Sequence, residues 1–355
     1  MEVGSSAQAG PSRFGIEWLL RCEPVTLAAG VLGISIVKYG LGLYPSWRYL
    51  LELAQNWRHP LVAPLFQIVH QRFLLDSPTS AVVAGVLHLT SERAFIAFHL
   101  LLACAAIVAP FGLRAVRRSA ELRLTVALLL IGGAVPPMLL DWVGSYDPVS
   151  IAAGALAALA SNPISRAVAW AVFAFNDAPE AAVAGGVFAL VLWADKGREE
   201  LPRILSSFAG GLAGYVAIRI VTSAWGGGQS EFTMMKYYGF HEYLRGYGYL
   251  PLVALAALGV GWLFLADRNV RSLPPVRWLL GLSACVVIGI PLIALDTSRI
   301  AAGSLWPALL VVTAIVIGRL GVERSRALLA RIAPVALLLV IVLAWNVFLT
   351  YPGWG

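Results

Sequence analysis

The sequence contains few charged residues. Only 13% of its 355 residues are Asp, Glu, Lys or Arg, whereas 59% are hydrophobic. A soluble domain of this size does not need so large an apolar fraction, so the composition excludes an ordinary globular protein and predicts an all-α, polytopic membrane protein. The formal charge is +7, but the basic residues fall in short clusters between apolar runs, as orientation signals do. No stretch has the character of a nucleic-acid-binding surface.

Several signatures of familiar sites are also missing. The three cysteines, Cys22, Cys104 and Cys285, lie far apart and form neither a metal-binding spacing nor a disulfide framework. The chain has no Walker A sequence, Rossmann glycine fingerprint, GxSxG elbow or Cys/His zinc pattern. It also has no repeat of fixed period. The sequence therefore offers no motif for nucleotide, serine-hydrolase or zinc chemistry.

Eleven apolar runs predict membrane-spanning helices, because a span needs about 20 apolar residues and buried spans need somewhat fewer. Residues 1–23 are expected to form a cytoplasmic tail and residues 24–355 a single transmembrane domain. The predicted spans cover residues 24–43, 92–112, 122–140, 147–161, 164–176, 180–194, 203–224, 249–266, 277–295, 300–318 and 332–350.

Lys and Arg residues in the loops predict the orientation of these spans. The four basic loops are residues 114–123, 195–203, 267–277 and 319–331. Eleven spans place all four on the side of the N-terminus, taken as cytoplasmic, and leave the C-terminus outside. The outer loop 44–91 contains amphipathic stretches that begin at prolines, which predict interfacial helices. Its last part is either a third such helix or the start of the next span.

Acidic residues begin several helices on the predicted outer face. Asp147 precedes a proline, Asp177 lies three residues before Glu180, and Asp296 opens another apolar run. Each aspartate has a sufficient explanation as a helix N-cap. Three helix starts in one compartment would also present positive dipole ends to an anion. The cations that could neutralise the same anion are Lys38, Arg219, Lys236, Arg245 and Arg299.

Simpler roles compete with anion binding at several of these positions. Asp296 and Arg299 are i, i+3 neighbours and could pair with each other, while Lys38 and Arg219 could extend to lipid headgroups. His241 lies in a polar, aromatic loop, where substrate contact competes with interfacial anchoring. The other histidines, His59, His70, His88 and His99, show no metal-binding spacing.

The layout of spans and loops resembles the GT-C superfamily of polytopic glycosyltransferases. The stretches "GSYDPVSIAAG" and "LDTSRIAAGSLWPALL" are similar to bacterial membrane proteins associated with surface polysaccharide. The resemblance implies an enzyme of the bacterial plasma membrane. Such an enzyme transfers a sugar from a polyprenyl-phosphate donor to a glycan or lipid acceptor on the extracytoplasmic side.

The resemblance also suggests where the general base lies. GT-C enzymes carry a catalytic acid soon after the first span, and here only Glu52 stands near that point, with Asp76 late in the same loop. The base that accepts the proton of the acceptor hydroxyl is therefore expected at Asp147 first, at Asp141 second, or at Glu52.

The departing phosphate needs a positive partner. Arg299 is expected to stabilise it, with help from Lys236 or Arg245. A divalent cation such as Mg²⁺ or Mn²⁺ could bridge acid and phosphate, although no ligand pattern demands one. Two other functions compete: a lipid-linked polysaccharide polymerase or ligase, and a secondary transporter, which would have charges near mid-bilayer and an inverted repeat with broken helices.

Overall fold

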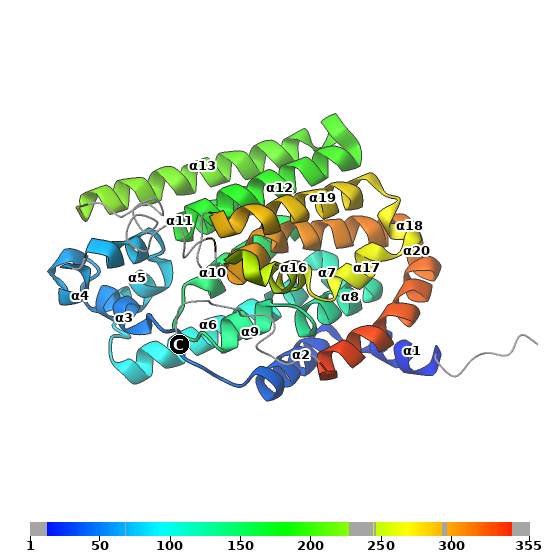
Figure 1. Ribbon diagram of the computed structural model, residues 1–355, viewed down its shortest axis with the longest axis horizontal. Helices are drawn as coiled ribbons and strands as arrows, with labels where there is room; N and C mark the ends of the chain where they lie inside the picture. The colour runs from blue at the N-terminus through cyan, green and yellow to red at the C-terminus, as the bar shows by residue number, and fades with distance from the viewer. Residues whose placement is uncertain (1–12, 68, 227–243, 245, 293–296, 343–355) are drawn as a thin grey trace, which may run out of the picture.

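The computed structural model is an elongated assembly of helices (Figure 1). It describes residues 13–67, 69–226, 244, 246–292 and 297–342. Within these ranges, extended structure is limited to one isolated parallel bridge between Leu43 and Val143. The all-α prediction is confirmed. Helices suit such apolar segments because each satisfies its own backbone hydrogen bonds.

Each of the eleven predicted apolar runs overlaps one helix or two consecutive helices. The helices that overlap these runs are α2 (Pro24–Tyr39), α6 (Glu92–Gly112), α8 (Ala120–Ile131) with α9 (Val135–Leu140), α10 (Asp147–Leu159), α11 (Pro163–Asn176), α12 (Ala178–Lys196), α13 (Leu201–Ala224), α16 (Leu250–Leu258) with α17 (Gly261–Ala266), α19 (Pro274–Gly289) and the two limbs of α20 (Thr297–Val342). The limbs of α20 meet at Gly321, whose φ of 72° favours glycine.

Among the described residues, four helical stretches are long and apolar enough to cross a membrane. They are Glu92–Gly112, Ala178–Ala224, Pro274–Leu292 and Thr297–Val342. The chain therefore has the helical character of a membrane protein.

Two of the helical runs are interrupted, and their interruptions touch. Between α16 and α17 the chain passes through Gly259, which packs against the backbone of Gly132 and Gly133 between α8 and α9. The Val260 amide donates to the Gly132 carbonyl at 2.9 Å, and the Tyr39 hydroxyl donates to the Ile131 carbonyl at 3.0 Å. Neighbouring segments thus satisfy backbone groups that the breaks expose.

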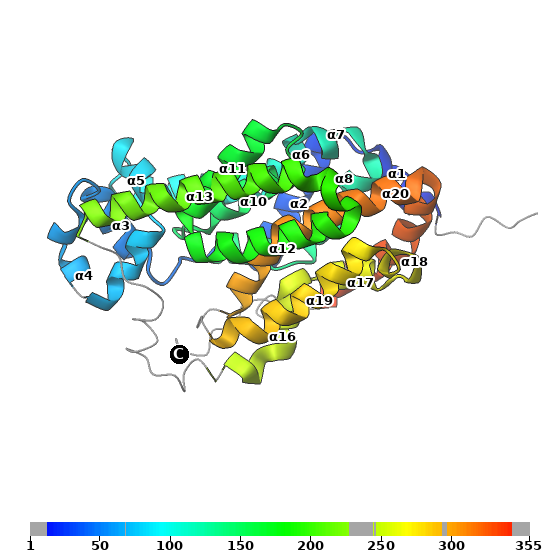
Figure 2. The same cartoon turned by 90° about the horizontal axis from the view of Figure 1, so that it is seen from above.

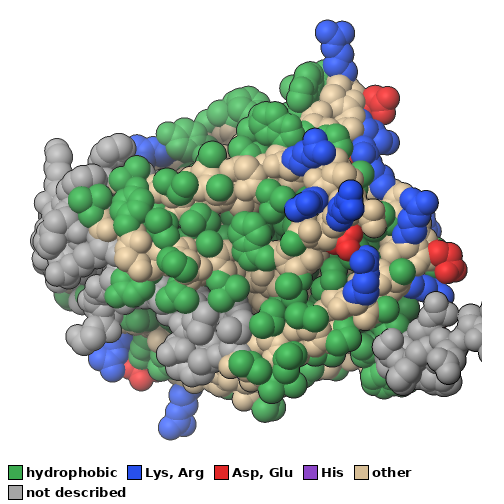
Figure 3. All heavy atoms as spheres, turned by 45° about the vertical axis from the view of Figure 1, so that its right-hand side comes forward, with side chains coloured by type: hydrophobic (Ala, Val, Ile, Leu, Met, Phe, Trp, Pro, Cys, Tyr) green, Lys and Arg blue, Asp and Glu red, His purple; other side chains and the backbone are tan. Residues whose placement is uncertain are grey.

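The four basic loops lie together at one end of the molecule, as the sequence predicts. Three ion pairs connect the last of them to the others. Arg326 contacts Glu121 at 3.1 Å, Arg331 contacts Asp267 at 2.8 Å, and Arg319 contacts Asp195. Figure 3 shows Lys and Arg side chains gathered at this end. The short helices α7 (Arg114–Arg118) and α18 (Arg268–Arg271) lie at the same end (Figure 1).

The loop 44–91 lies at the opposite end and is built from short helices. These are α3 (Trp47–Gln55), η1 (Pro60–Val62), α4 (Pro64–Gln67), η2 (Val69–Asp76) and α5 (Thr79–Val86). Leu50, Leu53, Phe66 and Leu74 form a separate small core there, which Tyr146 joins. In the described residues of this loop, 44–67 and 69–91, no helix is long enough to cross a membrane, as predicted, and α5 is separate from α6.

Candidate functional site

The turn 141–147 is held in place by the segment that follows α2. Beyond α2, the Gly42 amide donates to the Leu140 carbonyl at 2.9 Å, and the Tyr44 amide donates to the Val143 carbonyl at 2.9 Å. Gly144, at φ 98°, lies so close to Trp47 that a Cβ atom would be 2.8 Å from the Trp47 Cβ. The turn is therefore fixed against the outer-loop helices before α10 begins.

Asp147 forms a buried ion pair with Arg299. The Arg299 guanidinium donates to Asp147 Oδ1 at 2.6 Å, and the side chains are only 8% and 3% exposed. The guanidinium also lies over the Tyr146 ring, 5.2 Å from its centre. The interpretation of Asp147 as an N-cap is wrong: α10 begins at Asp147, Tyr146 is in the cap position, and no side chain makes a cap hydrogen bond there.

Asp177 and Glu180 form an acidic pair beside this ion pair. Asp177 is the N-cap of α12, as predicted, and its Oδ1 accepts a hydrogen bond from the Glu180 amide at 3.0 Å. The two carboxyl groups also interact directly with each other, so one of them is expected to hold a proton. Burial raises the pKa of Asp177, while Arg299 opposes the rise.

Gly303 makes room for the Glu180 side chain. A Cβ atom at position 303 would lie 1.8 Å from Glu180 Oε1. Glu180 is buried, so its carboxyl group is confined between α12 and the first limb of α20. Nearby, the Asn176 amide donates to the Tyr146 carbonyl at 3.0 Å and to Ser150 Oγ at 2.9 Å. This amide ties the end of α11 to the start of α10.

The cluster contains more acid than base. Within the part of the chain that the structure describes, Asp147, Asp177 and Glu180 all interact electrostatically with one cation, Arg299. One carboxylate oxygen, Asp147 Oδ2, is buried and has no hydrogen-bond partner among the described residues. Buried charge is costly unless it is paired, so the cluster is expected to hold protons or to bind a ligand.

Asp76, which is not among the residues predicted for the site, belongs beside this cluster. It ends η2, and it interacts electrostatically with both Arg219 and Asp177. Burial raises the pKa of Asp76 to about 6, with Arg219 lowering it and Asp177 raising it further. Its position late in the loop gave no sign of this proximity. The only available signal was that it is an acid in the first outer loop.

The other predicted residues are more scattered. Asp141 is half-buried at the end of α9 against Gly42, and burial raises its pKa. Glu52 is half-buried on α3. The Lys38 ammonium donates to the Val340 carbonyl in the second limb of α20. Asp296, Lys236, Arg245 and His241 lie outside the described residues.

The predicted divalent cation finds no ready-made ligand set in the described part of the chain. No group of three or more His, Cys, Asp or Glu side chains there is placed to hold a metal ion. Comparison with known proteins adds no further constraint: no family model, no curated protein and no solved structure matches this chain.

Proposed function

We propose that this protein is a membrane glycosyltransferase of the GT-C-like type, acting on a polyprenyl-phosphate-linked sugar. The acceptor is a glycan or lipid hydroxyl on the extracytoplasmic face of a bacterial plasma membrane. The observation that carries the proposal is the buried Arg299–Asp147 pair, with Asp177 and Glu180 beside it. Charges of this kind at one end of an apolar helical assembly are expected to serve a function.

The proposed membrane arrangement has eleven crossings. The basic loops, joined by their ion pairs, lie on the cytoplasmic side. The acid cluster and the loop 44–91 then lie on the opposite side, where the loop helices rest in the interface. This arrangement puts the charged cluster next to the compartment in which lipid-linked sugars would be used.

In the proposed reaction the acceptor oxygen attacks the anomeric carbon of the donor sugar. The bond between that carbon and the phosphate oxygen breaks, and its electron pair leaves with the lipid phosphate. Asp76 accepts the hydroxyl proton, and a pKa of about 6 suits a base that works near neutral pH. Arg299 and Arg219 stabilise the phosphate charge that develops.

Asp147 has a different role in this scheme. The sequence predicts Asp147 as the base ahead of Asp141 and Glu52. However, its Oδ1 already accepts a hydrogen bond from Arg299 at 2.6 Å. A carboxylate in this position orients the guanidinium toward the phosphate. We therefore assign Asp147 as a positioning residue and Asp76 as the base.

Transfer from a panel of polyprenyl-phosphate sugars, measured in lipid nanodiscs, tests the proposal. Asp76→Asn should lower kcat by about 10²–10⁴-fold, the usual contribution of a general base. Asp147→Asn keeps the side-chain shape and should lower kcat less. Asp141→Asn is the matched control, because Asp141 lies in the same region but contacts Gly42.

The results discriminate between the assignments. If Asp141→Asn abolishes transfer while Asp76→Asn leaves it intact, the assignment of the base is wrong. If the wild-type protein transfers no sugar from any lipid-phosphate donor in the panel, the proposed function fails.

A secondary transporter is the second candidate, and the touching breaks of the helical runs favour it. Many secondary transporters bind their substrate where interrupted helices meet. Here the contact between Gly259 and Gly132 is tight, and neighbouring groups bond the Ile131 and Gly132 carbonyls. Accumulation of labelled sugar phosphate in sealed proteoliposomes, without sugar transfer, would favour transport over the enzyme.

A further inference from the structure

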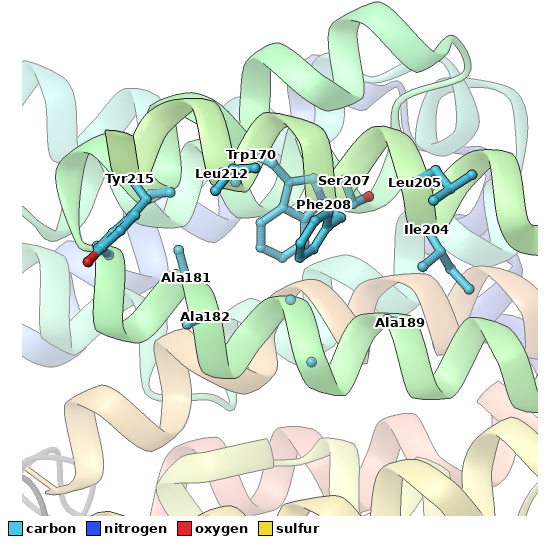
Figure 4. A pocket seen from close by; sticks show the side chains of 15 residues that line it. Trp170, Ala181, Ala182, Ala189, Ile204, Leu205, Ser207, Phe208, Leu212 and Tyr215 are labelled. Carbon is cyan, nitrogen blue, oxygen red and sulfur yellow. The ribbon is translucent and has the colours of Figure 1, made fainter. Parts of the chain in front are cut away.

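An apolar groove runs between α12 and α13, on the side of α12 that faces away from Glu180. Its volume is about 510 Å³. Figure 4 shows Tyr215 at one end, Ile204 and Leu205 at the other, and Trp170 with Phe208 between them. The Ser207 hydroxyl in the lining donates to the Arg203 carbonyl at 2.8 Å, so it is already satisfied within α13. The groove therefore offers hydrocarbon contacts along its length.

Glycines on the two faces of α13 have opposite surroundings. At Gly210 and Gly214 a Cβ atom would lie 2.1 Å from the carbonyl oxygens of Ala167 and Ala171, so these glycines let α13 pack directly on α11. A Cβ atom at Gly211, which lines the groove, would meet nothing within 4 Å, and the same holds for Gly186 on α12. The small residues of the groove thus leave open space. Figure 2 shows α11, α12 and α13 running alongside one another.

The groove is open on the outer surface of the helices. The groove side chains Leu205, Phe208, Leu212 and Tyr215 are between 49% and 68% exposed. In an apolar stretch of 18 residues within Ala178–Ala224, only 22% is buried within the protein. Within a bilayer this face would meet lipid tails, and a hydrocarbon chain could enter sideways.

The groove is long enough to hold a stretch of hydrocarbon chain. Ile204 and Tyr215 are eleven residues apart on α13, which corresponds to a length of about 16 Å. An apolar cavity of this size also disfavours water.

The outer end of the groove leads to the candidate site. Ala178 lines the groove directly after Asp177, the half-buried cap of α12. Arg219 is exposed and lies four residues after Tyr215, one turn farther along the same face of α13. The charge of Arg219 interacts with Asp76. A lipid lying in the groove would therefore have its phosphate at Arg219, beside the acids of the cluster.

We propose that the groove between α12 and α13 binds the hydrocarbon chain of the lipid-phosphate substrate, with the phosphate at Arg219. The identity of this lipid rests on the proposed function. Filling the groove should weaken binding of long-chain substrate without disturbing the acid cluster, which lies on the other side of α12.

Photo-crosslinking tests the proposal without requiring sugar transfer. The probe is a long-chain polyprenyl phosphate with a diazirine in its chain, added to the protein in nanodiscs, and the labelled peptides are mapped by mass spectrometry. We expect labels on α12 and α13 that Gly211→Leu removes, because leucine would project into the open space. Gly281→Leu is the matched control, since Gly281 on α19 also has no atoms within 4 Å of a Cβ position and lies outside the groove.

A second probe separates the substrate from bulk lipid. A diazirine-labelled diacyl phosphatidylglycerol should label the groove weakly and should be displaced by polyprenyl phosphate. Labelling by this phospholipid that polyprenyl phosphate does not displace overturns the proposal, and so does polyprenyl labelling that Gly211→Leu leaves unchanged. The proposal is also overturned if a second copy of the protein crosslinks across this face and blocks labelling by both lipids.

Transfer kinetics then link the groove to the reaction. Gly211→Leu should raise KM about tenfold for a long-chain donor, the loss expected when about two methylene groups leave apolar contact. It should leave KM unchanged for a donor too short to reach Gly211. Equal effects on both donors contradict the groove assignment, whereas absence of transfer in the wild-type protein contradicts the proposed function and leaves the crosslinking result to decide the groove.

Discussion

Arg299 is the cation on which the stability of the acid cluster depends most. In Arg299→Met the apolar part of the side chain is largely kept, but Asp147, Asp177 and Glu180 lose their shared positive partner. Removing one member of a buried ion pair costs about 3–5 kcal/mol, because the remaining charge is left uncompensated. We expect a loss of this size in the free energy of unfolding near neutral pH.

The destabilisation should depend on pH in a defined direction. Arg299 opposes the rise in the pKa of Asp177 that burial causes, so its removal raises that pKa further. The folded variant then holds a proton that the unfolded chain releases at its ordinary pKa of 3.8. Its stability is highest below that value and falls as pH rises toward the folded pKa. The variant should therefore be weakest relative to wild type at neutral and higher pH.

SDS-induced unfolding in detergent micelles, followed by tryptophan fluorescence at several pH values, measures this effect. The matched control is Arg331→Met, which removes the exposed partner of Asp267, a residue that is itself partly exposed, and should cost under about 1 kcal/mol. The double variant Arg299→Met/Asp147→Leu should recover part of the loss, because it also removes one stranded acid. Equal costs for Arg299→Met and Arg331→Met, or a cost that does not change with pH, would refute the reasoning.

Two further predictions concern Asp76 and Gly303. The folded pKa of about 6 for Asp76, against an ordinary value of 3.8, means that its contribution to stability is greatest below pH 4 and is lost as pH rises to 6. The full difference corresponds to about 3 kcal/mol, and we expect about half of that because the side chain is partly exposed. In Asp76→Asn this part of the pH dependence should vanish, and an unchanged profile between pH 4 and 6 would contradict the assignment. Gly303→Ala forces a Cβ atom against the confined Glu180 carboxyl group and should cost about 1–3 kcal/mol in the same unfolding assay. Gly318→Ala on the same helix meets nothing within 4 Å and should be neutral or slightly stabilising, so similar losses in the two variants would count against the packing explanation.

The helices were largely predictable because their signals are local. The run at 92–112 coincides with α6, and the spacing of Asp177 and Glu180 predicts the cap of α12, where Asp177 accepts a hydrogen bond from the Glu180 amide. The grouping of the basic loops also followed, because the number of apolar runs between them decides which end each loop reaches. The eleven membrane crossings remain a prediction.

The site was only partly predictable, because its contacts join distant segments. Asp147 and Arg299 were both candidates, but nothing local indicates that they contact each other across 152 positions in the chain. The sequence favoured a capping role for Asp147, since Asp before Pro is typical of a helix start. In the tertiary structure its carboxylate instead accepts a hydrogen bond from the Arg299 guanidinium.

Apolar periodicity and cap residues are properties of short stretches, and they were enough to determine the helical class, the approximate positions of the long helices and the two chemically different ends of the molecule. Only the packing of α10, α12 and α20 decided which acids share Arg299, and only η2 brought Asp76 near Arg219 and Asp177. The physical reason is that burial and the field of distant charges arise when segments pack, and no window of the sequence contains them. Likewise, Gly210 and Gly211 are neighbours of the same type. One faces α11 and closes a helix contact, and the other opens the groove.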